Sequence, residues 1–138
     1  MTATGSAGIK QYQQIDTQSN LATATPHRLV QMLMERALTK MGLAKAHMQR
    51  GEIQEKGSCI GVAISIVNML QASLNHKANA RMSANFDELY AYMMRRLLQA
   101  NVQNDPAILD EVSGLLQELK DAWDAITDQV EQQADSDI

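Results

Sequence analysis

The chain has 138 residues, the size of a single domain, and a composition that favours helices. Hydrophobic residues make up 45% of it but aromatic residues only 4%, so Leu, Ile, Val, Ala and Met supply the apolar mass. The single cysteine, Cys59, excludes an internal disulfide and suits a reducing compartment. We therefore expect one all-α domain in the cytoplasm.

The net charge of −4 conceals an asymmetry along the chain. Residues 1–104 carry eleven Lys and Arg against six Asp and Glu, whereas residues 105–138 carry one Lys against ten acids. The basic residues are scattered and not interleaved with aromatic side chains, so the sequence does not predict nucleic-acid binding. Residues 57–75 are uncharged, but their Ser, Asn and Gln side chains argue against a membrane span. The N-terminus lacks the features of a secretory signal.

Residues 1–24 are expected to form a flexible arm with a short helical turn. Residues 1–8 are almost all Gly, Ser, Thr and Ala, which cannot bury enough surface to fold alone. Ile9 and Tyr12 are three residues apart and would share one face of such a turn. We expect the folded domain to cover residues 25–131 and the last residues, 132–138, to fray.

The first long helix is predicted to begin at Thr25, which serves as N-cap, with Pro26 at the first helical position. Its apolar residues recur with the spacing of a core-facing stripe: Val30, Leu33, Met34, Ala37, Met41, Ala44 and Met48. Three more apolar residues fall outside this stripe: Leu29, Met32 and Leu43. They widen the apolar face beyond what one neighbouring helix needs.

The second helix is expected over residues 52–74, with apolar residues on two sides. One line consists of Ile53, Ile60, Ile64, Val67, Leu70 and Leu74. The other consists of Val62, Ile66 and Met69. A helix with this pattern is buried by more than one neighbour.

The third and fourth helices are separated by a clear break. A polar loop over residues 76–83 is expected to precede a capping box formed by Asn85 and Glu88. The face that follows consists of Phe86, Leu89, Tyr90, Met93, Leu97 and Ala100. Asp105 and Pro106 then start the last helix, whose seam consists of Leu109, Val112, Leu116, Leu119, Trp123, Ile126 and Val130. Four such helices joined by short loops predict an antiparallel up-down four-helix bundle with a short N-terminal helical arm.

Nothing in the sequence indicates a metal, a cofactor or a catalytic site. His27 is expected in the exposed first turn of its helix, and the three histidines are too scattered for a helical metal site: His27, His47 and His76. Cys59 has no histidine close to it in sequence, so we interpret it as a small buried hydrophobic residue. The protein is therefore predicted not to be an enzyme.

Two pairs of neighbouring carboxylates also have a structural interpretation. Asp87-Glu88 and Asp110-Glu111 are expected in the first turns of their helices. Carboxylates at that position complement the helix dipole. We therefore do not interpret either pair as a general acid and base.

Several short motifs occur in a characteristic order. They are Thr23-Ala-Thr-Pro26 followed by Leu29 and Met32-Leu33, then Leu89-Tyr-Ala-Tyr-Met-Met-Arg-Arg-Leu97, Ala100-Asn-Val-Gln-Asn-Asp105, Glu111-Val112 and Ala122-Trp123. In this order and spacing the chain resembles the flagellin export chaperone family, FliS. The resemblance covers residues 10–126.

The resemblance implies a cytosolic chaperone that binds the disordered C-terminal segment of flagellin. Such a chaperone prevents premature polymerisation and aids delivery to the flagellar type III export apparatus, whose components are further expected partners. In this family the client lies in apolar grooves, which the N-terminal segment can cover. The matched positions expected to carry family-specific roles are Tyr12, Thr25, Tyr90, Arg96, Asn101, Asn104 and Asp105.

Apolar residues on or beside the secondary faces of the first two helices supply a surface for helix-in-groove recognition. We expect the client to contact Tyr12, Leu29, Met32, Ile60, Val62, Ile66, Val67 and Met69. An alternative is a helical homo-oligomeric regulatory or structural protein, for instance a homodimer formed by exchange of the N-terminal arm. A helical enzyme with a dispersed site is a third.

Overall fold

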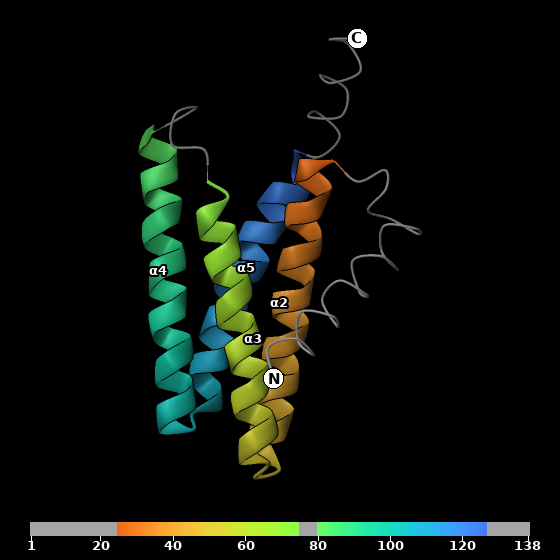
Figure 1. The fold of residues 1–138 in the computed structure, drawn as a ribbon, viewed down its shortest axis with the longest axis vertical. Coiled ribbons are helices and arrows are strands. Elements are labelled where there is room, and N and C mark those ends of the chain that lie inside the picture. Colours follow the sequence, from red (N-terminus) through yellow and green to blue (C-terminus); the bar gives the residue numbers. More distant parts are fainter. Residues whose placement is uncertain (1–24, 75–79, 127–138) are drawn as a thin grey trace, which may run out of the picture.

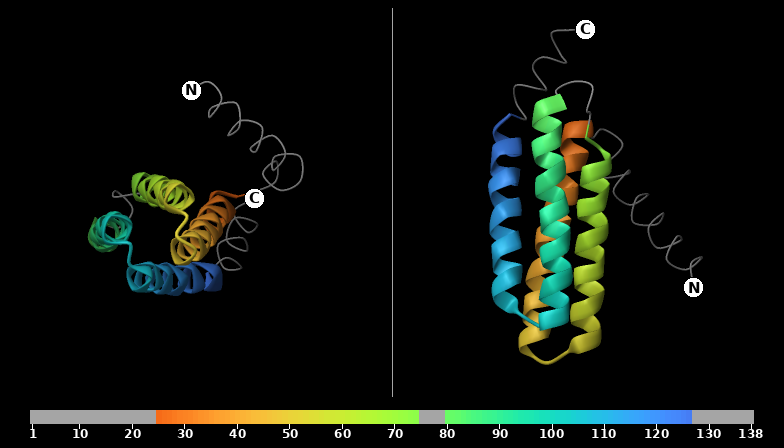
Figure 2. Two further views of the ribbon diagram at one scale, coloured as in Figure 1. Left: turned by 90° about the horizontal axis from the view of Figure 1, so that it is seen from below. Right: turned by 90° about the vertical axis from the view of Figure 1, so that its left-hand side faces the viewer.

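The chain forms a four-helix bundle in the computed structural model, which describes residues 25–74 and 80–126, with side chains omitted for residues 80–83. Neighbouring helices run in opposite directions, and the last helix returns beside the first (Figures 1 and 2). The helices are α2 (Pro26–Gln49), α3 (Ile53–Ala72), α4 (Ala80–Gln103) and α5 (Pro106–Ala125). This confirms the predicted antiparallel bundle. The expected arm, with Tyr12, and the expected frayed tail lie outside the described residues.

Two helices begin with the predicted combination of a capping side chain and a proline. Thr25 Oγ1 accepts a hydrogen bond from the Arg28 N–H at 3.1 Å, and Asp105 Oδ1 accepts one from the Ala107 N–H at 2.9 Å. Pro26 and Pro106 follow these caps, where the missing N–H of proline costs no helical hydrogen bond. Both starts are therefore determined locally.

The core consists mainly of the predicted stripes. Four alanines lie where the helices approach each other, and methionines fill the larger spaces. The buried members from α2, α4 and α5 are Met34, Ala37, Met41, Ala44, Met48, Tyr90, Met93, Leu97, Ala100, Ile108, Leu109, Val112 and Leu116. The methionines of α2 at helical spacing are thus mostly core, and Met32 is half-buried.

The start of α4 differs from its prediction. The helix begins at Ala80, so Asn85 lies inside it and does not cap it. The intervening Ala, Arg and Met residues are strong helix formers without Gly or Pro, and they extend the helix toward the N-terminus. Asp87 and Glu88 consequently lie beyond the first turn. In α5, Asp110 and Glu111 also follow the first turn and do not complement its dipole as predicted.

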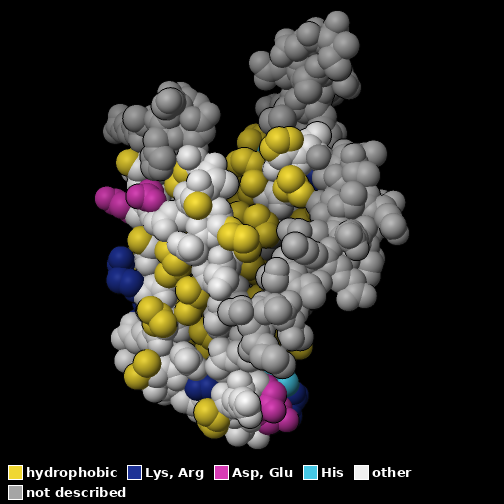
Figure 3. Space-filling model, in the orientation of Figure 1, with side chains coloured by type: hydrophobic (Ala, Val, Ile, Leu, Met, Phe, Trp, Pro, Cys, Tyr) yellow, Lys and Arg dark blue, Asp and Glu magenta, His cyan; other side chains and the backbone are white. Residues whose placement is uncertain are grey.

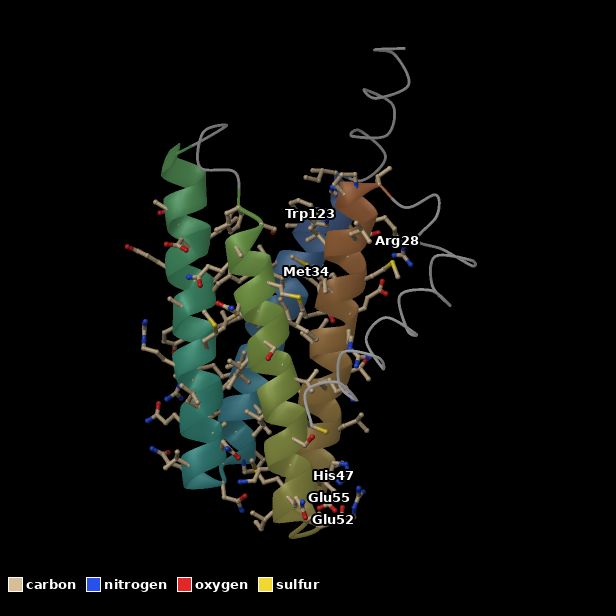
Figure 4. The ribbon with its side chains drawn as sticks, in the orientation of Figure 1. Arg28, Met34, His47, Glu52, Glu55 and Trp123 are labelled. Atoms are coloured by element: carbon tan, nitrogen blue, oxygen red, sulfur yellow. The ribbon has the colours of Figure 1, made fainter. Side chains whose placement is uncertain are left out.

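The turn between α2 and α3 is held by a small charged cluster, visible at one end of Figure 4. Gly51 adopts a φ of 73°, which favours glycine. Glu52 Oε1 lies 2.8 Å from His47 Nδ1 and accepts a hydrogen bond from Arg50 Nε at 2.7 Å. These bonds, first that of His47 and then that of Arg50, lower the pKa of Glu52 below its ordinary value of 4.5.

The end of α4 is fastened by a buried lysine. Lys56, only 4% exposed, donates a hydrogen bond from Nζ to the main-chain oxygen of Asn101 at 2.9 Å. Carbonyls in the last turn of a helix lack an intrahelical partner, and a cation there also interacts favourably with the helix dipole. Asn104 then takes a left-handed φ of 54°, and the Asp105 N–H donates to the Ala100 oxygen at 3.2 Å. Lys56 thus links the start of α3 to the end of α4.

Replacing Lys56 should destabilise the bundle. Lys56→Ala leaves the Asn101 carbonyl without this donor inside the fold, and we expect the free energy of unfolding to fall by about 1–3 kcal/mol. Urea unfolding followed by circular dichroism measures this. Lys45→Ala is the control, because its exposed ion pair with Asp110 contributes about 0–1 kcal/mol. Equal stability of the two variants would contradict the capping role.

Candidate functional site

The predicted client-binding residues are divided by the structure between core and surface. Three are at most 2% exposed: Ile60, Ile66 and Val67. Four reach the surface, either exposed or half-buried: Leu29, Met32, Val62 and Met69. We call these four the α2–α3 seam. Tyr12 lies outside the described residues.

The predicted second apolar line of α3 is wrong at one position. Ile66 follows the buried Ala63 by three residues and precedes the buried Leu70 by four, so all three share the core face. Val62 and Met69 are seven residues apart, two helical turns, and remain at the surface. The first predicted apolar line of α3 also has an exception. Its first residue, Ile53, is 59% exposed and lies outside the core.

The α2–α3 seam is apolar, and its member Val62 packs against the core. Leu29 is 41% exposed and Met69 47%, while Met32 and Val62 are half-buried. Figure 3 shows hydrophobic side chains gathered between α2 and α3 on the half of the molecule where α2 begins. The two helices lie side by side near the turn that joins them and diverge toward the start of α2 (Figures 1 and 2). A partner on this seam would therefore meet the outer ends of side chains that are already anchored.

A second apolar edge lies on the other side of α3, toward α4. Figure 3 shows further hydrophobic side chains along this edge. The exposed apolar residues of α4 include Leu98 and Val102, which are one helical turn apart, and Val102 is 84% exposed. The sequence prediction did not include these residues, although two apolar residues at i and i+4 outside the predicted α4 stripe are the signal that could have found them.

Beyond its first turn, α3 presents no charged residue between the two edges. Glu55 and Lys56 are the only charged residues of α3, and Lys56 is buried. From Gly57 onward the exposed positions of the helix are Ser58, Gly61, Ser65, Asn68, Met69 and Ala72. Small uncharged side chains allow close approach without desolvation of charge, which suits an apolar helix better than a charged ligand.

The residues that match family motifs fasten helix ends and connect helices. Thr25 and Asp105 are N-caps, and Asn101 and Asn104 end α4 as described above. Tyr90 is buried in the core, and burial raises its pKa to about 12. These positions maintain the bundle rather than forming a binding surface of their own.

Arg96, the remaining motif residue, connects α4 to α5. Its Nε donates to Glu111 Oε1 at 2.7 Å, and the Tyr92 hydroxyl donates to Glu111 Oε2 at 2.8 Å. The hydrogen bond from Arg96, and then that from Tyr92, lowers the pKa of Glu111. The same bond to Glu111 raises the pKa of Tyr92. Glu111 therefore pairs with a neighbouring helix, while its position beyond the first turn of α5 accounts for the absence of the predicted dipole interaction.

His27 is buried, contrary to its prediction as an exposed first-turn residue. Its ring stacks on Trp123 with centroids 4.2 Å apart and an interplanar angle of 8°. Nε2 lies 2.9 Å from the Trp123 oxygen, and Trp123 Nε1 donates to the His27 oxygen at 3.0 Å. The two residues are 96 positions apart, so only the fold brings them together. Figure 4 labels Trp123 at the end of the bundle where α2 begins.

Within residues 25–74 and 80–126, no group of three or more His, Cys, Asp or Glu is placed to hold a metal ion. None of the described helices is long and apolar enough to cross a membrane. Cys59 is half-buried against the core. The described surface thus carries the α2–α3 seam and a second apolar edge, and it lacks a cluster of metal-binding groups.

The family profile described as flagellar protein FliS matches residues 8–130. The chain belongs to the FliS family. It is 44% identical over 119 residues to the flagellar secretion chaperone FliSB of Pseudomonas aeruginosa, covering 86% of this chain and 94% of the relative. It is 38% identical over 122 residues to the flagellar secretion chaperone FliS of Salmonella typhimurium, covering 88% and 90%.

A crystal structure described as a flagellar chaperone from bacteria matches with a TM-score of 0.72 at 17% identity, covering 87% of this chain and 98% of that one. This likeness supports the fold. Membership of the FliS family gives the chain a chaperone role in flagellar export and confirms the prediction that it is not an enzyme.

Acid should weaken the connection between α4 and α5. Because the folded-state pKa of Glu111 lies below 4.5, the contribution of its carboxylate is complete above that pH and is lost as the pH falls through the folded-state pKa. We expect the Tm of wild type to be higher than that of Glu111→Gln at neutral pH. This difference in Tm should disappear in acid. Glu118→Gln, on the exposed face of the same helix, is the control. A difference for Glu111→Gln that persists unchanged in acid would contradict this assignment.

Proposed function

We propose that this FliS-family chain binds the disordered C-terminal segment of flagellin in the cytoplasm. It thereby prevents premature polymerisation and aids delivery to the flagellar type III export apparatus. The observation that carries the proposal is the α2–α3 seam, an exposed apolar surface beside an uncharged helix face. Family membership supports the chaperone role, and the seam supplies the surface on which an apolar client segment would be held.

Client binding would be stabilised by burial of the parts of the seam side chains that are still exposed. Leu29 and Met69 are each about half exposed, and covering the exposed part of such a side chain contributes about 1 kcal/mol. Ile66 lies one turn from both Val62 and Met69 and supports them from within the core. We therefore assign Ile60, Ile66 and Val67 to the support of the seam. Tyr12 remains a proposed contact from the N-terminal arm.

A client helix would satisfy its own main-chain hydrogen bonds and present an apolar face to the seam. This mode of recognition requires apolar anchors at i, i+3 or i+4, and i+7 on the client. Because the outer face of α3 is neutral, the client does not need charged residues to pair with it. Binding is accordingly expected to depend weakly on salt and to show the negative heat-capacity change of apolar burial.

Titration calorimetry with a peptide of the flagellin C-terminal segment tests this function. We expect saturable binding with negative ΔCp, and a loss of about tenfold or more in affinity for Met69→Asp and Leu29→Asp, because each places a charge in an apolar contact. Gly114→Asp is a matched control, since this exposed position on α5 has nothing within 4 Å of an added Cβ. Ile66→Asp is unsuitable, because a charge at this buried position would unfold the bundle.

The same variants distinguish a client from a second copy of the chain. Sedimentation velocity without peptide measures self-association. If wild type is a dimer that Met69→Asp converts to a monomer, and no peptide binds, the seam serves homo-oligomerisation and the chaperone proposal is wrong. Equal peptide affinities for wild type, Met69→Asp and Leu29→Asp would show that the peptide does not bind at the α2–α3 seam.

A further inference from the structure

The first turn of α2 has one buried and one exposed side. His27 is the second residue of the helix yet only 6% exposed, while Leu29 in the same turn is 41% exposed. Two residues correspond to about 200° around a helix, so the two side chains point in nearly opposite directions. The turn therefore has a buried face against α5 and an open face toward the α2–α3 seam.

The buried face is a reciprocal contact in which each ring bonds the other residue's main chain. A carbonyl oxygen can only accept, so His27 Nε2 carries the hydrogen that it donates to Trp123 O at 2.9 Å. Trp123 Nε1 donates in return to His27 O at 3.0 Å, and the rings stack in parallel. Trp123 lies in the last turn of α5, and its oxygen also accepts a hydrogen bond from the Ile126 N–H at 3.2 Å. We call this contact the His27–Trp123 clasp.

Further polar contacts extend the clasp along the same side of α2. Gln31 Nε2 donates to Asp124 Oδ1 at 2.6 Å. Lys120 Nζ lies 2.6 Å from Asp124 Oδ2 and 3.8 Å from Glu35 Oε1. Asp124 is thus shared by the two helices, and the pairing with Lys120 and then Gln31 lowers its pKa. Successive turns of α2 are fastened to the end of α5 opposite the α2–α3 seam.

We propose that His27 is a positioning residue for client binding. Through the clasp it keeps the first turn of α2 ordered and so fixes Leu29 and Met32 in the α2–α3 seam. This inference rests on the proposed function. Helix ends are prone to fray, and the exposed Leu29 contributes little burial to this one. His27 acts through the helix and does not touch the client, because its ring is enclosed by Trp123.

Three variants test the positioning role by hydrogen exchange and peptide binding. His27→Ala should raise amide exchange of residues 29–33 more than that of residues 41–48. If this turn is then ordered only a fifth of the time, the dissociation constant of the flagellin peptide rises about fivefold. His27→Gln should recover much of the binding, because its amide Nε2 can donate to the same carbonyl. Trp123→Phe keeps an aromatic ring but loses the indole donor, so it should give an intermediate result.

Ala44→Gly provides a control for general loss of stability. Glycine at this buried position, near the end of α2, destabilises the helix away from the clasp. If Ala44→Gly lowers peptide affinity as much as His27→Ala at an equal decrease in Tm, the effect is one of stability and the positioning role is wrong. The role is also wrong if His27→Ala leaves both exchange and binding unchanged. If wild type does not bind the peptide, the proposed function fails, while the exchange pattern still decides whether the clasp orders the turn.

Discussion

The apolar packing of α3 between α2 and α4 is the constraint on which the bundle depends. α3 carries two charged residues, Glu55 and the buried Lys56, and supplies Ile60, Ala63, Ile66, Val67 and Leu70 to the core. A helix with so little charge cannot be held by ion pairs along its length, so its position depends on burial. Lys56 fixes one end by its bond to α4. The consequence is an outer face without charge, between two apolar edges.

The acidic α5 has a complementary role and accounts for part of the charge asymmetry along the chain. Asp110 pairs with Lys45 of α2, and Glu111 with Arg96 of α4. Asp124 accepts hydrogen bonds from Gln31 of α2 and from Lys120 of its own helix. Individual exposed pairs contribute little to stability, but they fix the rotation of α5 relative to both neighbours. Polar contacts thus concentrate on the side of the bundle opposite the uncharged face of α3.

Local and periodic features of the sequence predicted most of this fold. Helical spacing identified the core stripes, and the Thr25 and Asp105 caps marked two helix starts. The start of α4 was wrong because helix propensity before Asn85 outweighed a capping pattern. The site was predicted less well. Whether an apolar residue of α3 faces a neighbour or solvent depends on the directions of α2 and α4, so Ile66 could not be separated from Met69 by spacing alone.

Contacts between residues far apart in the chain could not be predicted from the sequence. Nothing local indicates that His27 meets Trp123, because the bond depends on α5 returning to the start of α2. Yet this contact gives a structural role to Trp123, one of the motif residues. A binding helix must keep its exposed face in position without burying it, and this requires anchorage from the opposite face. In this bundle α5 supplies that anchorage, so the buried His27–Trp123 contact and the exposed Leu29 lie on opposite sides of the same turn of α2.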